Sequence, residues 1–132
     1  MIDPASMAWS SMPVPVWARW CAVGLAASAG ALLIWTFHTL GPNLTDTVVT
    51  RRVHTLVTNG PYRWVRHPLY TATAIIVLGN SLTAANWFLL AAGAVVFTMM
   101  VVRTKREEAF LIARFGDSYR EYMARTGRLL PR

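Results

Sequence analysis

Charged residues are missing from two long stretches of this 132-residue chain. No Lys, Arg, Asp or Glu lies between Arg19 and Asp46, and none lies between His67 and Arg103. A membrane-spanning helix needs about 20 apolar residues to cross roughly 30 Å of hydrocarbon, and both stretches are long enough. Apolar residues make up 55% of the chain and charged residues 14%, against about 45–50% and about 25% in soluble domains. We therefore expect an integral membrane protein.

The first stretch predicts one membrane-spanning helix over about residues 16–40. It is followed by Gly41-Pro42, a pair at which helix continuation is disfavoured. Small residues four apart allow a second helix to approach closely, and this stretch has two such pairs: Gly24 with Ser28, and Ala26 with Gly30.

The second stretch, residues 68–102, is too long for one span, because a single helix of 35 residues would measure about 52 Å. Asn80-Ser81 and Asn86-Trp87 lie near its middle and offer polar turn residues and an interfacial aromatic residue. We expect two short spans, about residues 69–83 and 87–102, that form a helical hairpin.

Residues 103–122 have helical spacing, with Phe110, Leu111 and Phe115 on one side. They predict an interfacial amphipathic helix that is broken near Gly116. The expected fold is therefore an all-α integral membrane protein with about three transmembrane helices, one plus a hairpin, and an amphipathic C-terminal helix. Residues 1–46 form the N-terminal segment with the first span, and residues 47–132 form the core.

Basic residues predict how the chain crosses the membrane. Residues 43–66 hold four Arg and one Asp, and the segment from Arg103 onward holds eight Lys or Arg and four acids. Two spans separate these segments, so they lie on one side, which the positive-inside rule makes cytoplasmic. The N-terminus then lies outside, and both basic segments and the C-terminus lie inside. The net charge of +7 fits anionic membrane lipids better than nucleic acid.

Polar side chains gather just before the hairpin. His54, Tyr62, His67 and Tyr70 fall within about 20 residues, and Pro68 suits the first turn of the next helix. The unpaired N–H groups and dipole of such a helix start can hold a carboxylate. The alternative is ordinary interface chemistry, because Arg, Tyr and Trp favour the headgroup region in many membrane proteins.

Two adjacent acids, Glu107 and Glu108, follow the hairpin. One interpretation is a solvated charge run with an i,i+4 pair between Arg103 and Glu107. The other is a buried carboxylate that binds an ammonium group or faces a sulfonium. A metal site is not expected, because the three His are far apart and there is one Cys.

Three blocks, in this order and spacing, resemble the isoprenylcysteine carboxyl methyltransferase family and the related phospholipid methyltransferases. They are HTLVTNGPYRWVRHPLY, RTKREEAFLIARFGDSYREY and GRLLP, and the resemblance covers about residues 47–131. It implies a membrane-embedded enzyme that uses S-adenosylmethionine. It assigns the cofactor to His54, Thr55, Leu56, Val57, Tyr62, His67, Pro68, Leu69, Tyr70 and Glu107, and the substrate to Arg103, with Arg103 and Glu107 as catalytic residues.

The implied reaction moves a methyl group to a lipophilic acceptor, which is a prenylcysteine-like carboxylate or a lipid amine or thiol. The chain departs from the family in having Ala72 where Gly is frequent, and in having fewer spans before the motif. In relatives the additional spans help to shape the substrate tunnel. A homo-oligomer formed through the first span could supply the walls of that tunnel that are missing here. The alternatives are a sterol-reductase-like NADPH enzyme, disfavoured by Leu69 where that family has Asn, and a non-catalytic membrane module of the same fold.

The charge pattern makes a prediction about sidedness. Reporter domains fused at residue 1 and inserted at residues 84–86 should report an outside location, and a reporter after Arg132 should report the cytoplasm. Accessibility labelling in intact cells measures this. A reporter at residues 84–86 that is found in the cytoplasm would contradict both the hairpin and the charge argument.

Overall fold

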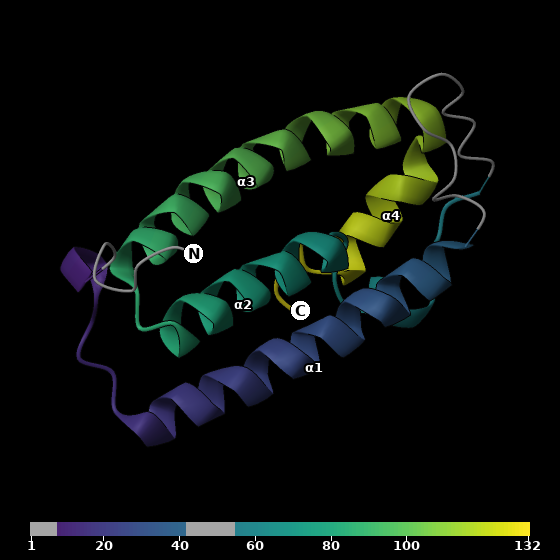
Figure 1. Cartoon of the computed structure of the whole chain (residues 1–132). Coiled ribbons are helices and arrows are strands. Elements are labelled where there is room, and N and C mark those ends of the chain that lie inside the picture. The colour runs from purple at the N-terminus through teal and green to yellow at the C-terminus, as the bar shows by residue number, and fades with distance from the viewer. Residues whose placement is uncertain (1–7, 42–54) are drawn as a thin grey trace.

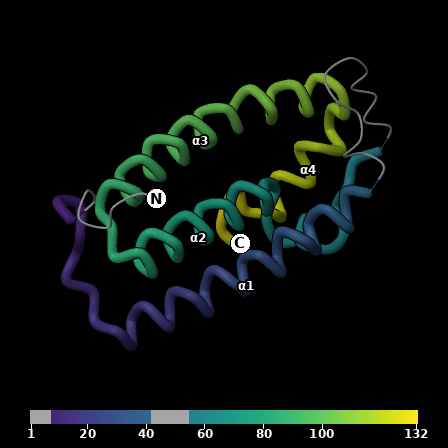
Figure 2. The backbone as a smooth tube through the Cα atoms, in the orientation of Figure 1, coloured from purple at the N-terminus to yellow at the C-terminus, as the bar shows by residue number. Residues whose placement is uncertain are grey.

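The computed structural model describes residues 8–41 and 55–132. All regular secondary structure in these ranges is helical: α1 Val16–Leu40, the short 3-10 helix η3 Gly60–Arg63, α2 Pro68–Thr83, α3 Trp87–Phe115 and α4 Asp117–Arg125. Figure 1 shows α2 lying between α1 and α3, with α4 turning back from the end of α3. Figure 2 follows the same path, in which the start of α2 lies near η3 and the end of α1.

The first predicted helix and the predicted hairpin are confirmed. α1 has the expected bounds, and α2 and α3 are joined by a tight turn at residues 84–86. Asn86 caps α3 by accepting a hydrogen bond of 3.1 Å from the backbone N–H of Leu89. Pro68 occupies the first turn of α2, where its missing N–H has no helical partner to lose.

The structure differs from the prediction after Val102. We expected a new helix to begin near Arg103, but α3 continues without a break to Phe115. Its charged stretch consists of residues with good helix propensity, and an ion pair of 2.9 Å between Arg103 and Glu107 supports it at i,i+4 spacing. The expected break near Gly116 is confirmed, since Gly116 has a φ of 55°, a conformation that favours glycine. Only residues 117–125 form a separate C-terminal helix.

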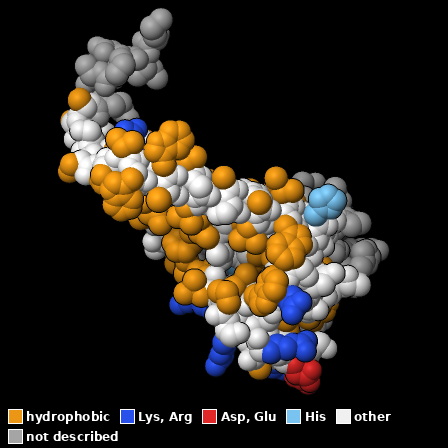
Figure 3. Space-filling view, turned by 90° about the horizontal axis from the view of Figure 1, so that it is seen from below, with side chains coloured by type: hydrophobic (Ala, Val, Ile, Leu, Met, Phe, Trp, Pro, Cys, Tyr) orange, Lys and Arg blue, Asp and Glu red, His pale blue; other side chains and the backbone are white. Residues whose placement is uncertain are grey.

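α1 and α3 have the length and hydropathy of membrane spans. Only 17% and 6% of their most apolar windows are buried, which a core helix of a soluble protein would not show. Trp20 of α1 and Met99 of α3 are 72% and 67% exposed. Figure 3 shows apolar side chains along most of the visible face and charged side chains mainly at one edge. α2 has 16 residues, so its role as a third span stays a prediction.

Aromatic side chains mark both ends of the bundle. Trp9 packs on Trp87 at the start of α3, with ring centroids 5.5 Å apart. Trp35, near the end of α1, packs on Trp64 with centroids 5.8 Å apart. Pairs at opposite ends fit the two headgroup regions of a bilayer, where tryptophan is enriched.

Close packing of α1 on α2 depends on small residues. A Cβ at Gly79 of α2 would lie 2.9 Å from the carbonyl oxygen of Ala22 and 2.9 Å from the Cβ of Ala26. Ala26, one of the predicted small residues, therefore faces α2. Gly24 and Gly30 have open space at the Cβ position and are not used in this contact.

Replacing single glycines with alanine should separate the effect of packing on the free energy of unfolding from the effect of helix propensity. Gly79→Ala should lower the free energy of unfolding by about 1–3 kcal/mol, the cost of forcing a methyl into a packed contact. Gly24→Ala is the matched control, because it adds the same methyl to a helix where nothing lies within 4 Å. The control should be neutral or gain up to about 1 kcal/mol from helix propensity. Denaturant titration in detergent micelles measures both, and equal effects would contradict the packing.

Candidate functional site

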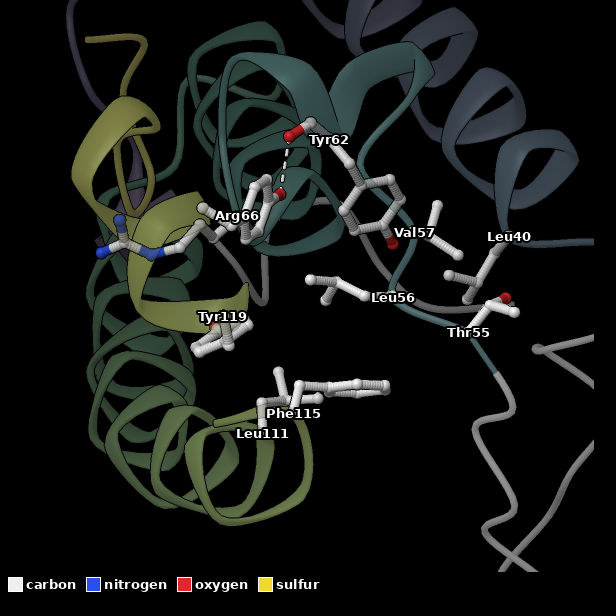
Figure 4. A pocket seen from close by; sticks show the side chains of 10 residues that line it. Leu40, Thr55, Leu56, Val57, Tyr62, Arg66, Leu111, Phe115 and Tyr119 are labelled. Atoms are coloured by element: carbon white, nitrogen blue, oxygen red, sulfur yellow. Dashed lines mark hydrogen bonds between the residues drawn. The ribbon is translucent and has the colours of Figure 1, made fainter. Parts of the chain in front are cut away.

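The predicted site residues lie at one end of the bundle, where α1 ends, α2 begins and α3 becomes charged. An apolar cavity of about 210 Å³ opens here. Figure 4 shows its lining side chains converging from four parts of the chain: Leu40, Thr55, Leu56, Val57, Tyr62, Arg66, Leu111, Phe115, Tyr119 and Tyr122. Four of the residues assigned by resemblance, Thr55 to Val57 and Tyr62, are therefore brought together. His54 lies outside the described residues.

Tyr62 stands on η3, which forms for local reasons. Gly60 has a φ of 55°, and Pro61 follows at the start of the helix. The hydroxyl of Tyr122 donates a hydrogen bond of 2.6 Å to the backbone carbonyl of Tyr62, which ties α4 to η3. Burial, with a smaller contribution from Glu107, raises the pKa of the Tyr62 phenol to about 12. Tyr62 therefore stays protonated and can donate a hydrogen bond.

A polar cluster centred on Glu107 lies beside the cavity. One carboxylate oxygen accepts a hydrogen bond from the Tyr70 hydroxyl at 2.7 Å and forms an ion pair with Nε of Arg103 at 2.9 Å. The other oxygen lies 3.7 Å from Nδ1 of His67. The rings of His67 and Tyr70 stack, with centroids 5.5 Å apart and planes 6° apart. The structure thus brings together four more of the predicted residues.

His67 is buried at the N-cap of α2. Burial lowers the pKa of its imidazole, while Glu108 and Glu107 act in the opposite direction and Arg66 adds to the lowering. Nε2 makes no hydrogen bond within the described residues, although Oε1 of Glu108 lies 3.5 Å away. Pro68 and Leu69 form the first turn of α2 and do not line the cavity.

One face of α3 joins the cavity to the polar cluster. Arg103, Glu107, Leu111 and Phe115 are spaced by four, so they lie in one row along the helix. The first two belong to the polar cluster, and the last two line the cavity. The row runs from the charged Arg103 to the apolar Phe115 over about 18 Å, because an α-helix rises about 1.5 Å per residue.

The resemblance missed several cavity residues. Leu40, Leu111, Phe115, Tyr119 and Tyr122 line the cavity and carried no assigned role. The i+4 row that starts at Arg103 could have indicated Leu111 and Phe115. Tyr119 and Tyr122 could not be placed from sequence, because the turn at Gly116 decides which side of α4 faces the cavity.

The two adjacent acids have different surroundings. Glu108 is 4% exposed and is paired with Arg66 and Arg128 at 2.9 and 2.6 Å. The side chain of Glu107 is 28% exposed, and its only guanidinium partner among the described residues is Arg103, itself 62% exposed. An exposed pair of this kind contributes at most about 1 kcal/mol. Glu107 is therefore the acid that can exchange its partner for a ligand.

Comparison with known proteins finds a matching family model and related methyltransferases. The model of the isoprenylcysteine carboxyl methyltransferase family matches residues 22–113. The protein-S-isoprenylcysteine O-methyltransferase of Schizosaccharomyces pombe is 40% identical over 70 residues, 52% of this chain and 30% of the relative. The methanethiol S-methyltransferase of Mycobacterium tuberculosis is 27% identical over 144 residues, 93% of this chain and 56% of the relative.

A solved structure agrees with the fold. The eukaryotic intramembrane Ras methyltransferase, an isoprenylcysteine carboxyl methyltransferase, superposes with a TM-score of 0.75 and 26% identity. The match covers 87% of this chain and 42% of that protein. The chain thus spans about a third to just over half the length of the relatives described here.

Fold and site together define a helical integral membrane protein with a cavity and a carboxylate cluster at one end of its bundle. The family match covers well over half of the chain and includes the start of α2, Arg103 and Glu107. The chain belongs to the isoprenylcysteine carboxyl methyltransferase family.

The lowered pKa of His67 predicts a pH dependence of stability. As the pH falls below 6.5, the ordinary pKa, the unfolded chain takes up a proton that the folded chain resists. Stability should therefore fall with pH in this range. Thermal unfolding in detergent from about pH 7.5 to about 5.5 measures it. His67→Asn should flatten the dependence, while His38→Asn, on the exposed end of α1, should leave it unchanged. Parallel curves for all three proteins would contradict the assignment.

Proposed function

We propose that this chain carries the cofactor site of a membrane-embedded methyltransferase that moves a methyl group from S-adenosylmethionine to a lipophilic acceptor. The observation that supports this most is the position of Glu107, an acid at the junction of an aromatic-walled cavity and a polar cluster. The chain's family membership agrees with it.

The residues present fit the chemical groups of S-adenosylmethionine. The cavity offers aromatic walls from Tyr62 and Phe115 for an adenine base. Glu107 suits the ammonium and sulfonium charges. The start of α2, with His67 at its N-cap, suits a carboxylate. We therefore assign cofactor binding to His54, Thr55, Leu56, Val57, Tyr62, His67, Pro68, Leu69, Tyr70 and Glu107.

When bound, S-adenosylmethionine supplies an electrophilic methyl group on a sulfonium. The chain's own residues position the reactants and exclude water, which accounts for much of the rate in such a displacement. Tyr70 holds the Glu107 carboxylate through its hydroxyl, and burial keeps Tyr62 protonated beside it. Arg103, exposed one turn before Glu107, is proposed to hold the acceptor.

The proposed acceptor is amphipathic and reaches the site from the bilayer. A guanidinium suits an acidic acceptor such as a prenylcysteine-like carboxylate, which needs no general base. The yeast relative is named for protein S-isoprenylcysteine and the mycobacterial relative for methanethiol. A lipid amine or a thiol is therefore kept as a second acceptor class, and either would need proton removal.

The arrangement in the membrane follows from the same proposal. The N-terminus lies outside, and the active site and C-terminus lie on the cytoplasmic side, where the cofactor is available. Residues 1–46 supply the first span, and residues 47–132 supply the cofactor core. A homo-oligomer through α1 would add walls around the acceptor. The family match favours a methyltransferase over a sterol-reductase-like enzyme. A non-catalytic module would bind no S-adenosylmethionine, or would bind it without forming product.

Removing Glu107 or Arg103 should separate binding from turnover. Glu107→Ala should weaken S-adenosylhomocysteine binding by about 1.5–3 kcal/mol, the scale of a charge-assisted hydrogen bond. Arg103→Ala should leave that affinity nearly unchanged and reduce methyl transfer. Calorimetry measures binding, and labelled S-adenosylmethionine with a total lipid extract measures turnover. Glu121→Ala, an exposed acid on α4, is the matched control.

The result that would contradict the assignment is parental binding and turnover in both variants. Glu107 and Arg103 would then form only a surface ion pair. Binding without any labelled product in the parent protein would instead support the non-catalytic module.

A further inference from the structure

Glu108 is the most enclosed acid among the described residues. Only 4% of it is exposed, and two guanidiniums hold both of its oxygens. Nε of Arg66 donates to Oε1 at 2.9 Å, and Arg128 donates from Nη2 to Oε2 at 2.6 Å and from Nε to Oε1 at 3.2 Å. A buried carboxylate with two cationic partners is strongly held, because losing either partner removes charge-assisted hydrogen bonds at a place that little water reaches.

The same two arginines tie down the end of the chain. We call residues 126–129 the strap. Besides binding Glu108, Arg66 donates to the backbone carbonyls of Met123, at 3.0 Å, and Thr126. Arg128 is itself a strap residue. Glu108 therefore connects three segments that are far apart in sequence: the turn before α2, the middle of α3 and the strap.

Backbone hydrogen bonds fix the strap against the start of α2. The N–H of Arg66 donates to Gly127 at 2.8 Å, and the N–H of His67 donates to Arg128 at 3.1 Å. The Thr71 hydroxyl donates to the carbonyl of Leu129 at 2.7 Å. Gly127 is needed here, because a Cβ at this position would lie 1.7 Å from the carbonyl oxygen of Leu130. The strap thus holds the backbone of His67 from outside α2.

Glu108 also determines where its neighbour points. Successive residues of an α-helix are about 100° apart around the axis, so fixing one side chain fixes the direction of the next. With Glu108 directed to Arg66 and Arg128, Glu107 is directed to Tyr70 and His67. The charge of Glu108 is already matched by two guanidiniums, which leaves Glu107 as the acid for a cationic ligand.

We propose that Glu108, Arg66 and Arg128 are positioning residues that lock α3 and the strap together, and so align Glu107 and His67 for the cofactor. Glu108 and Arg128 do not line the cavity and act through their partners, whereas Arg66 also lines it. The inference rests on the proposed function, because it assigns Glu107 and His67 to that cofactor. It adds that the strap contributes to cofactor binding by helping to align Glu107 and His67.

Calorimetry with S-adenosylhomocysteine on the detergent-purified full chain tests this. The variants are Glu108→Gln, Arg128→Gln, their double variant and Arg128→Lys. Arg132→Gln is the matched control, because it removes the same type of side chain from the same tail beyond the strap. Each titration is made well below the variant's own unfolding midpoint, so that a lost affinity does not report unfolding.

Each single Gln variant should bind S-adenosylhomocysteine about tenfold more weakly, the lower scale for losing a residue that orients a binding group. Since Glu108 and Arg128 act through one contact, the double variant should bind S-adenosylhomocysteine no more weakly than the single variant with the lower affinity. Arg128→Lys should recover part of the affinity, and it is the milder variant if Glu108→Gln does not fold. Arg132→Gln should bind like the parent.

Three results would overturn the inference. Folded Arg128 variants that bind like the parent would make the strap a stability element only, and additive losses in the double variant would exclude a shared contact. Failure of the parent itself to bind S-adenosylhomocysteine would overturn the proposed function and this inference with it. Parental binding with unaffected variants would overturn the inference alone.

Discussion

The arrangement of this site depends on a helix that passes from hydrocarbon to water without a break. α3 runs from Trp87 to Phe115, and its most apolar part is almost entirely exposed to the surroundings of the protein. Because it does not end at Val102, the row from the Arg103 guanidinium through the Glu107 carboxylate to the wall of the cavity is rigidly joined to the apolar span. A helix end near Val102 would have left this row on a second helix with no fixed position relative to the span.

The position of the site at the end of the bundle suits one polar reactant and one apolar reactant. The cavity and the Glu107 cluster lie where the apolar spans give way to charged residues, so a polar cofactor can enter from water. Arg103, where we propose that a lipophilic acceptor is held, directly follows the exposed apolar residues Met99 and Val102 of α3. Burial matters as much as charge, since it keeps the phenol of Tyr62 protonated and the imidazole of His67 resistant to protonation.

Much of the fold could be predicted from local chemistry. The absence of charge located α1 and the hairpin, and Asn86 and Gly116 marked a helix start and a helix end through their ordinary capping behaviour. The continuation of α3 past Val102 could not be predicted from hydropathy, because a change from apolar to charged residues does not end a helix whose residues all favour it. Tertiary packing also decides that Gly79 lies against Ala22 and Ala26, while nothing lies within 4 Å of a Cβ at Gly24.

The site was predictable where a motif kept its residues close in sequence. Tyr62, His67 and Tyr70 come from one block, and the structure gathers them near Glu107. The different environments of Glu107 and Glu108 were not predictable, because they depend on Arg66 and Arg128, which come from distant segments. Neighbouring acids look alike in sequence, and only the packed structure separates the enclosed one from the available one.

We propose that this chain holds a site for S-adenosylmethionine. Isothermal titration of the detergent-purified chain with S-adenosylhomocysteine, and separately with NADPH, tests this proposal. We expect saturable binding of S-adenosylhomocysteine at one site per chain and no binding of NADPH. Binding of NADPH alone, or of neither ligand by a folded chain, would contradict it.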